Sequence, residues 1–390
     1  MIAKTKIKKI ISKNTPSDLD LFFTRKCNLH CHYCFLHKEG TDNVTLGTLD
    51  EGSLKKSIDI LFSYPGKKKA ISFMGGEPTL EFPLIKKIYN YAKNEANKKN
   101  ITLIASLVTN GTFLNQEMVD FFIKNKISFR ISIDGDRLTH DQNRPFKSNP
   151  KKSSFDQIIR NIDRINFGDL PLAASMVLIP NGTKRLLENL DFLNNKGFVW
   201  IDFVPDLYAN WQERDLEKIR NAMKNFESYY IKLVKGGGKT FKTSLLRRFV
   251  NDESGNKLSV CGKIHIDVDK NFYLCDRAFA LEKKPREKYI VGNIQEGIDN
   301  NKRLQLLDKI GNDFFKESGL DCLKCKYYKY CCCPIGLYIY YLNLEKLNKI
   351  KQGQSFLKSF CEILKIYIEA NLRIKKALRY NLNFIELYEN

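Results

Sequence analysis

The amino-acid sequence predicts an α/β fold, a partial (β/α)6 TIM-like barrel followed by a small cysteine-rich domain. From Leu19 to about Lys235, short β-rich runs alternate with amphipathic helical stretches, which is typical of repeated βα units around a parallel sheet. The run Gly236-Gly237-Gly238 is a flexible break. After this break the composition shifts toward cysteines and aromatic residues, so we place a domain boundary near Gly238.

Six strands are expected from the β-rich runs, at Leu19–Thr24, Ala70–Met74, Ile101–Val108, Ile127–Ile133, Leu172–Ile179 and Phe198–Val204. Amphipathic helices are expected between them, at Leu54–Ser63, Leu84–Lys98, Gln116–Lys124, Phe155–Ile165 and Arg185–Asn195. A further helical run at Arg214–Lys235 closes the series.

The composition is that of a globular protein with a large basic excess. A chain of 390 residues with 43% hydrophobic and 12% aromatic residues can bury a large core. Its formal net charge of +21, from 65 Lys+Arg against 44 Asp+Glu, would suit nucleic acid, acidic peptides or anionic membranes. The lysines are scattered, however, and the compact run Lys67–Lys69 follows a turn at Pro65-Gly66. A solvated surface is therefore favoured, and nucleic acid is not expected as a partner.

No segment reads as a targeting signal or a membrane span. Residues 1–12 are basic but lack an apolar run, and no stretch approaches the roughly 20 apolar residues of a membrane helix. We therefore expect a soluble, cytoplasmic protein with no membrane partner. In a reducing cytosol, the 11 cysteines are expected to be metal ligands rather than disulfides, because they fall into two tight groups.

The first cysteine group, Cys27, Cys31 and Cys34, directly follows the first expected strand. Three thiolates from one short loop can hold three irons of a 4Fe-4S cluster and leave the fourth iron without a protein ligand. A zinc site is the alternative, with His30 or His32 as a fourth ligand, although structural zinc sites favour paired two-residue spacings.

The spacing Cys-x3-Cys-x2-Cys, with the aromatic Tyr33 just before the last cysteine, resembles the radical S-adenosylmethionine (SAM) superfamily. Gly75-Gly76-Glu77-Pro78, at the end of the second expected strand, is similar to the family's segment that binds the methionyl amino group of SAM. Glycines let the backbone approach a ligand, and a carboxylate can pair with an ammonium.

Two further stretches resemble SAM contacts of this family. Thr109-Asn110-Gly111 follows the third strand, and Ser132-Ile133-Asp134-Gly135 with Asn143-Arg144-Pro145 follows the fourth. Ser132 is similar to the ribose contact and Arg144 to a carboxylate contact. Each stretch alone is equally compatible with a turn or cap, but all follow C-terminal strand ends, where βα barrels build active sites. The resemblance thus implies these SAM-binding residues: Tyr33, Gly75, Gly76, Glu77, Pro78, Thr109, Asn110, Ser132, Asp134 and Arg144.

The mechanism implied by the resemblance is radical chemistry. Reduction of the open cluster passes one electron into the sulfonium of SAM, which releases methionine and a 5'-deoxyadenosyl radical that abstracts hydrogen from the substrate. The cofactors supply this chemistry, while the protein orients the reactants, tunes the redox potential and excludes water. A reducing partner such as ferredoxin or flavodoxin is implied as well.

The second cysteine group resembles the auxiliary-cluster domain called SPASM, named after peptide and sulfatase maturases. The resemblance rests on Cys322-x2-Cys325-x5-Cys331 with a distant Cys361, and on a hairpin-like segment between Cys261 and Cys275 that is followed by Val291-Gly292-Asn293-Ile294. Joined to the core, it divides the chain into an N-terminal extension (1–18), a radical SAM core (19–238), a SPASM-like domain (239–365) and a helical tail (366–390).

The sequence departs from this pattern at two positions. Lys270 stands where the pattern has a glycine, and Ile335 where it has a further cysteine, with Cys332 and Cys333 nearby as substitutes. The resemblance implies one auxiliary 4Fe-4S cluster on Cys322, Cys325, Cys331 and Cys361, and leaves in doubt a second on Cys261, Cys275 and either Cys332 or Cys333. A zinc ribbon built from Cys322, Cys325 and two later cysteines is the alternative.

Asp276 resembles the position of a general base in anaerobic sulfatase maturases, since a carboxylate beside a cluster can deprotonate an alcohol or thiol. The alternative is a surface carboxylate paired with Arg277. His140 and His265 are isolated and are assigned no role.

We expect a maturase that oxidatively crosslinks a ribosomally made peptide, with formylglycine formation from Cys or Ser on a sulfatase as the runner-up. Only 26 residues precede Cys27, so leader recognition would come from the second domain or from a separate leader-binding protein. A zinc-dependent nucleic-acid-binding protein would explain the charge and the paired cysteines, but not Gly75-Gly76-Glu77-Pro78 or the βα series.

Overall fold

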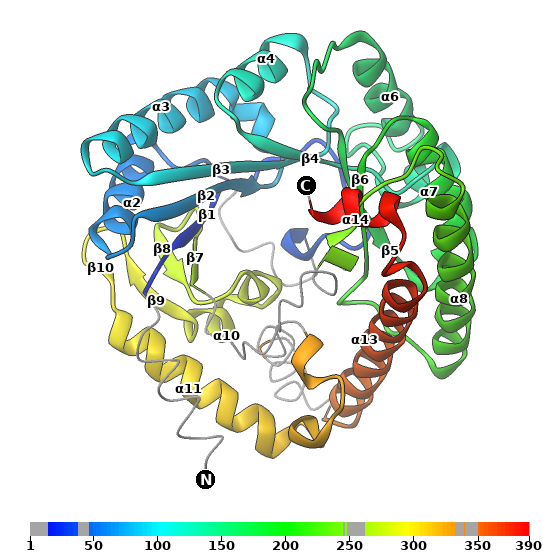
Figure 1. Ribbon diagram of the computed structural model, residues 1–390. Helices are drawn as coiled ribbons and strands as arrows, with labels where there is room; N and C mark the ends of the chain where they lie inside the picture. Colours follow the sequence, from blue (N-terminus) through cyan, green and yellow to red (C-terminus); the bar gives the residue numbers. More distant parts are fainter. Residues whose placement is uncertain are drawn as a thin grey trace.

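A ten-stranded sheet organises the computed structural model, which describes residues 15–37, 47–244, 246–247, 262–331, 339 and 350–389. The strand order is β10-β9-β8-β7-β1-β2-β3-β4-β5-β6 (Figure 1). Strands β1 to β6 pair in parallel with their neighbours, which confirms the predicted α/β barrel-like fold. Their bounds are β1 Asp18–Thr24, β2 Lys68–Gly75, β3 Thr102–Thr109, β4 Ser128–Ser132, β5 Ala173–Leu178 and β6 Trp200–Pro205.

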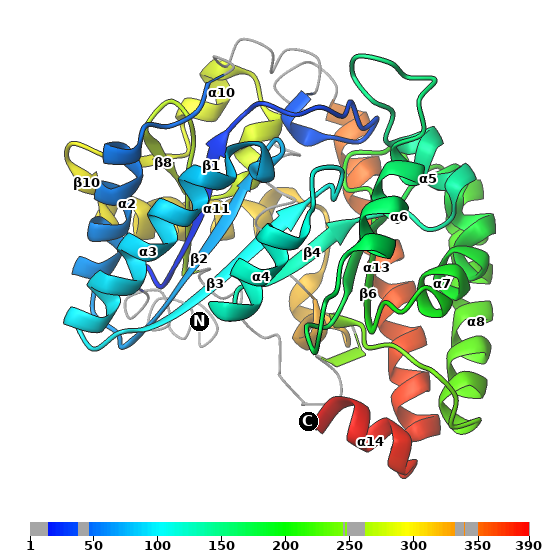
Figure 2. The same cartoon turned by 90° about the horizontal axis from the view of Figure 1, so that it is seen from above.

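Helices lie between successive strands and cover the outer face of the curved sheet (Figures 1 and 2). Their bounds are α2 Glu51–Ser63, α3 Phe82–Lys98, α4 Gln116–Lys124, α5 Arg137–Asn143, α6 Ser154–Arg164, α7 Leu186–Asn195 and α8 Glu213–Lys235. All were predicted except α5, whose seven residues are too few to show a helical hydrophobic period.

Side-chain caps fix the starts of several helices. In each case an Asp, Asn or Ser just before the helix accepts a hydrogen bond from a backbone N–H in the first turn. The capping residues are Asp50 for α2, Asn115 for α4, Asp136 for α5 and Ser153 for α6. Such caps contribute about 1 kcal/mol each, and they set where the chain turns from a strand end into a helix.

The second half of the chain continues the same sheet. Strand β7 (Lys263–Ile266) pairs in parallel with β1, and β8 (Asn271–Tyr273), β9 (Ile290–Asn293) and β10 (Gly297–Ile298) follow in antiparallel order. The boundary predicted near Gly238 therefore divides the sequence but not the sheet. The remaining elements are η4 Asp276–Ala280, α10 Lys283–Glu287, α11 Asn300–Glu317, η5 Cys322–Lys324, η6 Tyr328–Tyr330, α13 Ile350–Leu378 and α14 Leu382–Glu389.

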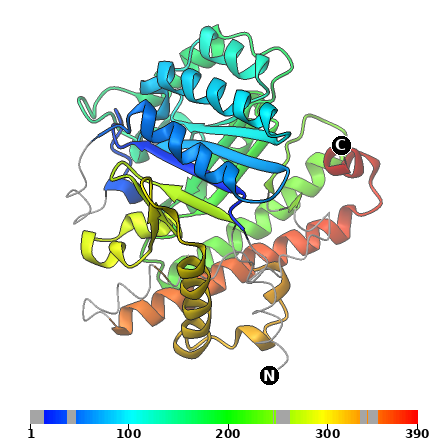
Figure 3. The same ribbon diagram turned by 90° about the vertical axis from the view of Figure 1, so that its left-hand side faces the viewer.

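Helix α13 closes the body beyond the last parallel strand, running alongside α8 (Figures 1 and 3). The ring of Phe203 on β6 lies 5.0 Å from Phe226 of α8 and 5.9 Å from Tyr367 of α13, measured between centroids. The predicted division between residues 365 and 366 falls inside α13. Among the described residues, no helix is long and apolar enough to cross a membrane.

A buried ion pair joins the first strand to the second half of the chain. Arg25, one residue after β1, donates from Nε to Oδ1 of Asp267 at 2.8 Å, and its Nη2 also bonds Oδ2. The two side chains are 3% and 0% exposed. The Arg25 guanidinium also lies 5.0 Å from the ring centroid of Phe279. This doubly hydrogen-bonded pair fixes the start of the cysteine loop against the turn between β7 and β8.

Replacing Asp267 by Asn is expected to lower the free energy of unfolding by about 3–5 kcal/mol, because the Arg25 guanidinium then stays buried without a counter-charge. The double variant Arg25→Met/Asp267→Leu should be less destabilised, because the Arg25 charge is removed as well and only Arg286, 3.7 Å from Asp267, loses a counter-charge. Urea unfolding of the metal-free protein checks this, and equal midpoints for the single and double variants would contradict it.

Candidate active site

The cysteine loop after β1 is held by a neighbouring segment of backbone, residues 143–147. His30 N–H donates to Pro145 O at 2.9 Å, His32 N–H to Asn143 O at 3.0 Å, and Lys147 N–H to Asn28 O at 2.9 Å. Within the loop, Cys34 N–H donates to Cys31 O at 3.0 Å. Cys27, Cys31 and Cys34 all line one cavity of about 280 Å³. The structure thus brings the predicted thiols together at the C-terminal ends of the strands.

Gly75 and Gly76 pack directly against the backbone that leads into this loop. A Cβ on Gly75 would lie 2.3 Å from Thr24 O, and one on Gly76 would lie 2.2 Å from Lys26 O. The backbones are joined there, since Gly76 N–H donates to Thr24 O and Glu77 N–H to Lys26 O, both at 2.8 Å. The glycines line the cavity as expected, but their small size is required by the chain segment that leads into Cys27.

Glu77 is buried in the cavity wall and ties two strand ends together. Its Oε1 accepts from Thr109 Oγ1 at 2.7 Å and from Thr79 N–H at 3.0 Å, while Oε2 accepts from Asn110 N–H at 2.6 Å. Burial raises the pKa of Glu77, although these hydrogen bonds oppose the rise. A carboxylate in this position can accept an ammonium group from a ligand in the cavity.

Asp134 is fully buried and does not itself line the cavity. Tyr33 Oη donates to its Oδ2, Arg144 Nη2 donates to its Oδ1 at 3.0 Å, and Val177 N–H donates to Oδ1 at 3.0 Å. Burial acts to raise the pKa of Asp134, but the Arg144 charge outweighs it and the pKa is lowered. Asp134 therefore links the cysteine loop to the ends of β4 and β5 and orients Arg144.

Most residues predicted to bind SAM line the cavity. They are Tyr33, Gly75, Gly76, Glu77, Thr109, Asn110, Ser132 and Arg144. Pro78 and Asp134 are buried beside the cavity and are absent from its lining. One hydrogen-bond donor of Arg144 is unused, because its buried Nε has no hydrogen-bond partner in the described structure.

Part of the cavity wall is built from residues that the sequence did not single out for binding. Asp206 and Tyr208, in the segment after β6, and Arg277 of η4 line it. Arg277 Nη1 donates to Tyr208 Oη at 3.4 Å. The segment after β6 lies at the C-terminal ends of the strands, like the other site residues. This position in the sequence could have identified Asp206 and Tyr208 as site residues. Arg277 approaches through the second half of the chain, which no local pattern predicts.

Asp276 does not line the cavity. Its Oδ1 lies 3.9 Å from Arg277 Nε and accepts a contact from Cys275 Sγ at 3.5 Å. The pairing with Arg277 that the sequence offered as the alternative is present, and the side chain keeps 28% of its surface exposed. Asp276 therefore lies beside Arg277 and is not part of the cavity wall.

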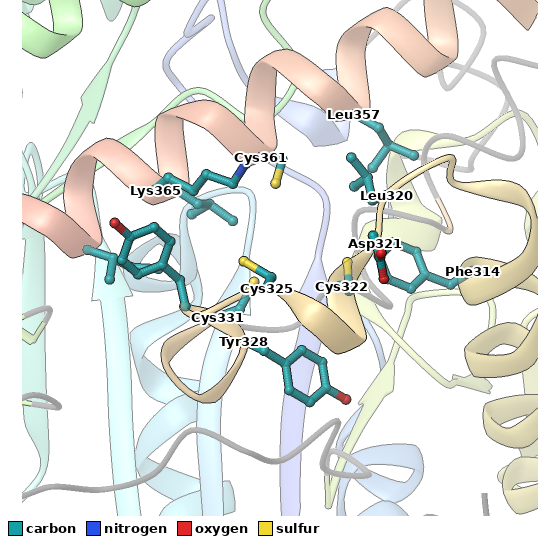
Figure 4. A pocket seen from close by; sticks show the side chains of 13 residues that line it. Phe314, Leu320, Asp321, Cys322, Cys325, Tyr328, Cys331, Leu357, Cys361 and Lys365 are labelled. Carbon is teal, nitrogen blue, oxygen red and sulfur yellow. The ribbon is translucent and has the colours of Figure 1, made fainter. Parts of the chain in front are cut away.

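Four cysteines of the second group line a separate cavity of about 100 Å³ (Figure 4). Cys322, Cys325 and Cys331 come from the turns η5 and η6, and Cys361 points toward them from α13. Apolar side chains surround the thiols, and burial raises the pKa of Cys322 to about 11. Four thiols around one small space suit a thiolate-binding metal group.

The other predicted auxiliary ligands are not assembled by the described residues. Cys275 follows β8, and Cys261, Cys332 and Cys333 lie outside the described residues. Lys270, where the sequence pattern expects glycine, has a φ of 66°. The left-handed turn that glycine would favour is therefore kept, with a lysine in it.

Within the described parts of the chain, no three His, Cys, Asp or Glu side chains converge on one metal-ion position. The thiols of each group instead surround a common space. An iron–sulfur cluster spreads its thiolate ligands over several irons, so both donor sets fit such a group.

Comparison with protein families decides the identity of the first half. The model of the Radical SAM superfamily matches residues 21–193, which include the cysteine loop, the Gly-Gly turn and the strand ends around the cavity. These residues form a radical SAM domain. The family implies a 4Fe-4S cluster and SAM, and the cavity offers three thiolates and a polar wall for them.

Relatives of this radical SAM enzyme include a sulfatase-maturating enzyme and a cyclopropyl synthase. It is 26% identical over 377 residues to the cysteine-type anaerobic sulfatase-maturating enzyme of Clostridium novyi (strain NT), covering 91% of this chain and 96% of the relative. It is 22% identical over 241 residues to the radical SAM cyclopropyl synthase TigE of Paramaledivibacter caminithermalis, covering 58% of this chain and 49% of TigE.

Solved structures share the fold of the radical SAM enzyme. Native anSMEcpe with bound AdoMet and Kp18Cys peptide aligns with a TM-score of 0.66 at 20% identity, covering 90% of this chain and 99% of that one. Streptococcus suis SuiB bound to precursor peptide SuiA aligns with a TM-score of 0.57 at 15% identity, covering 84% of this chain and 73% of that one.

Replacing Gly76 by Ala is expected to abolish iron binding at the cysteine loop, because the added Cβ would meet Lys26 O at 2.2 Å. Gly311→Ala is the matched control, since a Cβ at this helical glycine meets nothing within 4 Å. Iron content and SAM binding of both variants check the prediction. A Gly76→Ala protein with a full complement of iron would contradict it.

His140 predicts a pH dependence of folding. It is fully buried, and burial together with Arg144 lowers its pKa from 6.5 to about 4. Between these values the unfolded chain binds a proton that the folded chain does not, so stability should fall as the pH falls through this window. From pH 7 to pH 4, the wild type should lose about 3 kcal/mol more than His140→Gln. Urea unfolding at both pH values measures this, and parallel losses would refute it.

Proposed function

We propose that this radical SAM enzyme oxidatively modifies a residue of a ribosomally made peptide, forming a crosslink. The observation that carries the proposal is the composition of one cavity of about 280 Å³. Its wall combines the cysteine loop and the polar strand ends with Asp206, Tyr208 and Arg277. The Tyr208 ring stacks on that of Phe35, directly after Cys34, with 6.2 Å between centroids, so a cofactor on the loop would lie beside a substrate that contacts these three residues. Peptides bound to the structural relatives support a peptide as that substrate.

At the cofactor end, Cys27, Cys31 and Cys34 would hold a 4Fe-4S cluster, which with SAM supplies the 5'-deoxyadenosyl radical that abstracts hydrogen. Glu77 would accept the SAM ammonium, and Ser132 would contact the ribose. The remaining backbone and side-chain contacts come from Tyr33, Gly75, Gly76, Thr109 and Asn110.

Arg144 binds the SAM carboxylate in this proposal, and Asp134 positions it. The ion pair between Arg144 and Asp134 is buried and fixes the guanidinium in one orientation. It leaves the Nε–H of Arg144 without a hydrogen-bond partner in the described structure. Pro78 starts the buried turn η2 (Pro78–Glu81) and so shapes the segment that carries Glu77.

In the second cavity, Cys322, Cys325, Cys331 and Cys361 would hold one auxiliary cluster. Four thiols on a small apolar cavity complete its ligand set without any other residue. A second auxiliary cluster would need Cys275 with Cys261 and either Cys332 or Cys333. In this proposal the auxiliary cluster would accept the second electron that an oxidative modification must remove from the substrate after hydrogen abstraction.

Formylglycine formation on a sulfatase is the second candidate. It is supported by full-length similarity to a sulfatase-maturating enzyme and by the adjacent pair Cys275-Asp276. In this version Asp276 acts as the general base on the substrate thiol or alcohol. Asp206 competes for that role, because it lines the cavity and Asp276 does not. Asp276→Asn and Asp206→Asn, compared for product formation at equal SAM cleavage, separate the two.

The first experiment compares wild type with Cys27→Ala/Cys31→Ala/Cys34→Ala and with Cys361→Ala, purified without oxygen and reduced with dithionite. The wild type should form 5'-deoxyadenosine. The triple variant should lose this activity while keeping iron at the second cavity, and Cys361→Ala should lose that iron while still cleaving SAM. Zinc in place of iron, with no SAM cleavage, would overturn the radical mechanism.

Products identify the reaction. The enzyme and SAM are incubated with candidate peptides encoded next to the enzyme, or with a sulfatase peptide that contains cysteine. Mass spectrometry then measures the change in peptide mass. Loss of a hydrogen pair with sulfur retained supports a crosslink. Exchange of sulfur for an aldehyde oxygen supports formylglycine and replaces the leading proposal.

A further inference from the structure

Lys365 brings a positive charge to the four-cysteine cavity. The other described residues that line this cavity are apolar side chains, tyrosines, the four cysteines and Asp321. Lys365 lies four residues after Cys361 in α13, so the two side chains share one face of that helix. Figure 4 shows both of them on the side of α13 that faces the other three cysteines. A single cation therefore lies against the space that the thiols surround.

An ion pair holds the ammonium group of Lys365 in place. Its Nζ donates to Glu362 Oε1 at 2.6 Å, and the two side chains are 34% and 43% exposed. Glu362 is more exposed than Lys365, and it does not line the cavity. The pair thus presents its cation, and not its anion, to the thiols.

The acid that lines the same cavity is better exposed to water. Asp321 is 61% exposed and pairs with Lys324 at 2.9 Å. Water and dissolved ions screen such a charge, and Lys324 offsets it further. Apolar side chains form most of the remaining wall, which lowers the local dielectric constant and strengthens the effect of a charge that faces inward. Among the described residues, Lys365 is therefore the charge with the greatest effect inside the cavity.

We infer that Lys365 raises the reduction potential of the auxiliary cluster in this cavity. The inference rests on the proposed function, which places an iron–sulfur cluster on the four thiols. Net charge and hydrogen bonds to the sulfurs set the potential of such a cluster. A neighbouring ammonium group stabilises the reduced form, because that form carries one more negative charge than the oxidised form.

A higher potential suits the electron transfer that the proposed crosslinking requires. Hydrogen abstraction leaves a radical on the substrate carbon. When this carbon bonds to the attacking atom of the peptide, one electron passes to the oxidised cluster and the attacking atom releases its proton. Lys365 favours this step because it stabilises the added negative charge at the place where the electron arrives. The lysine itself neither gives nor takes the proton.

The test compares Lys365→Met and Lys365→Arg with the control Lys326→Met. Methionine removes the charge but keeps an unbranched side chain, and arginine keeps the charge. Lys326 directly follows Cys325, yet it is exposed, lies 4.7 Å from the ring centroid of Tyr327 and does not line the cavity. The control therefore makes the same charge change beside a cluster ligand, but on a side chain that faces solvent.

Each change is made in the full chain that also carries Cys27→Ala/Cys31→Ala/Cys34→Ala, so that the cysteine loop contributes no iron signal. The midpoint potential is measured by electron paramagnetic resonance during a redox titration without oxygen. The signal that disappears in a further Cys361→Ala variant identifies the cluster of this cavity. The measurement needs neither SAM nor a peptide.

Lys365→Met should shift the redox equilibrium about tenfold toward the oxidised cluster, which is a potential about 59 mV lower for a one-electron couple. Lys365→Arg should keep the wild-type potential. Lys326→Met should stay within about twofold of the wild-type equilibrium, because solvent screens its charge. An unchanged potential in Lys365→Met would overturn the inference and leave Lys365 as a surface partner of Glu362. Equal shifts in Lys365→Met and either comparison variant would overturn it as well.

A loss of iron in Lys365→Met would bring Glu362→Gln into the test. This change removes the counter-charge of Lys365, so the potential should rise, and an unchanged or lower potential would contradict the inference. Zinc in the second cavity of the wild type would overturn the inference together with the proposed auxiliary cluster. A wild type that holds iron at both sites but forms no 5'-deoxyadenosine would refute the proposed radical reaction, and the measured potentials would still decide the role of Lys365.

Discussion

The buried pair between Arg25 and Asp267 is the constraint on which the site depends. It fixes the residue that leads out of β1, and on either side of it the carbonyls of Thr24 and Lys26 accept hydrogen bonds from the Gly-Gly turn after β2. The cysteine loop begins at the next residue. Its position is thus set jointly by the second strand and by a turn some 240 residues later in the chain.

This arrangement joins the two halves of the chain in one sheet. Strand β7 pairs with β1 on the side opposite β2, so the strand that carries the cysteine loop lies between the two halves. Arg277, two residues beyond Cys275, reaches the same cavity from the second half. Any change that loosens the second half therefore reaches the cofactor end through β1.

The sequence predicted the parallel strands and the edge at which the site lies, because hydrophobic period and strand order determine both. It missed α5, which is too short to show a period, and it gave His140 no role although that residue packs beside Asp134. It also placed Asp134 and Pro78 among the ligand contacts, whereas both lie behind the wall. Local motifs identify which residues belong to a site, but only packing between strand ends decides which of them face the cavity.

The closing helices have a consequence for how the protein is made. Tyr388 of α14 shares a hydrogen bond with Tyr230 of α8 and accepts one from Thr243 N–H, so the last residues of the chain complete the packing around α8. Cys361 likewise joins its three partners only when α13 is in place. A ribosome makes these residues after the strands of the sheet. The cysteine loop is synthesised long before Cys361, so a growing chain completes its two sets of thiols in a fixed order.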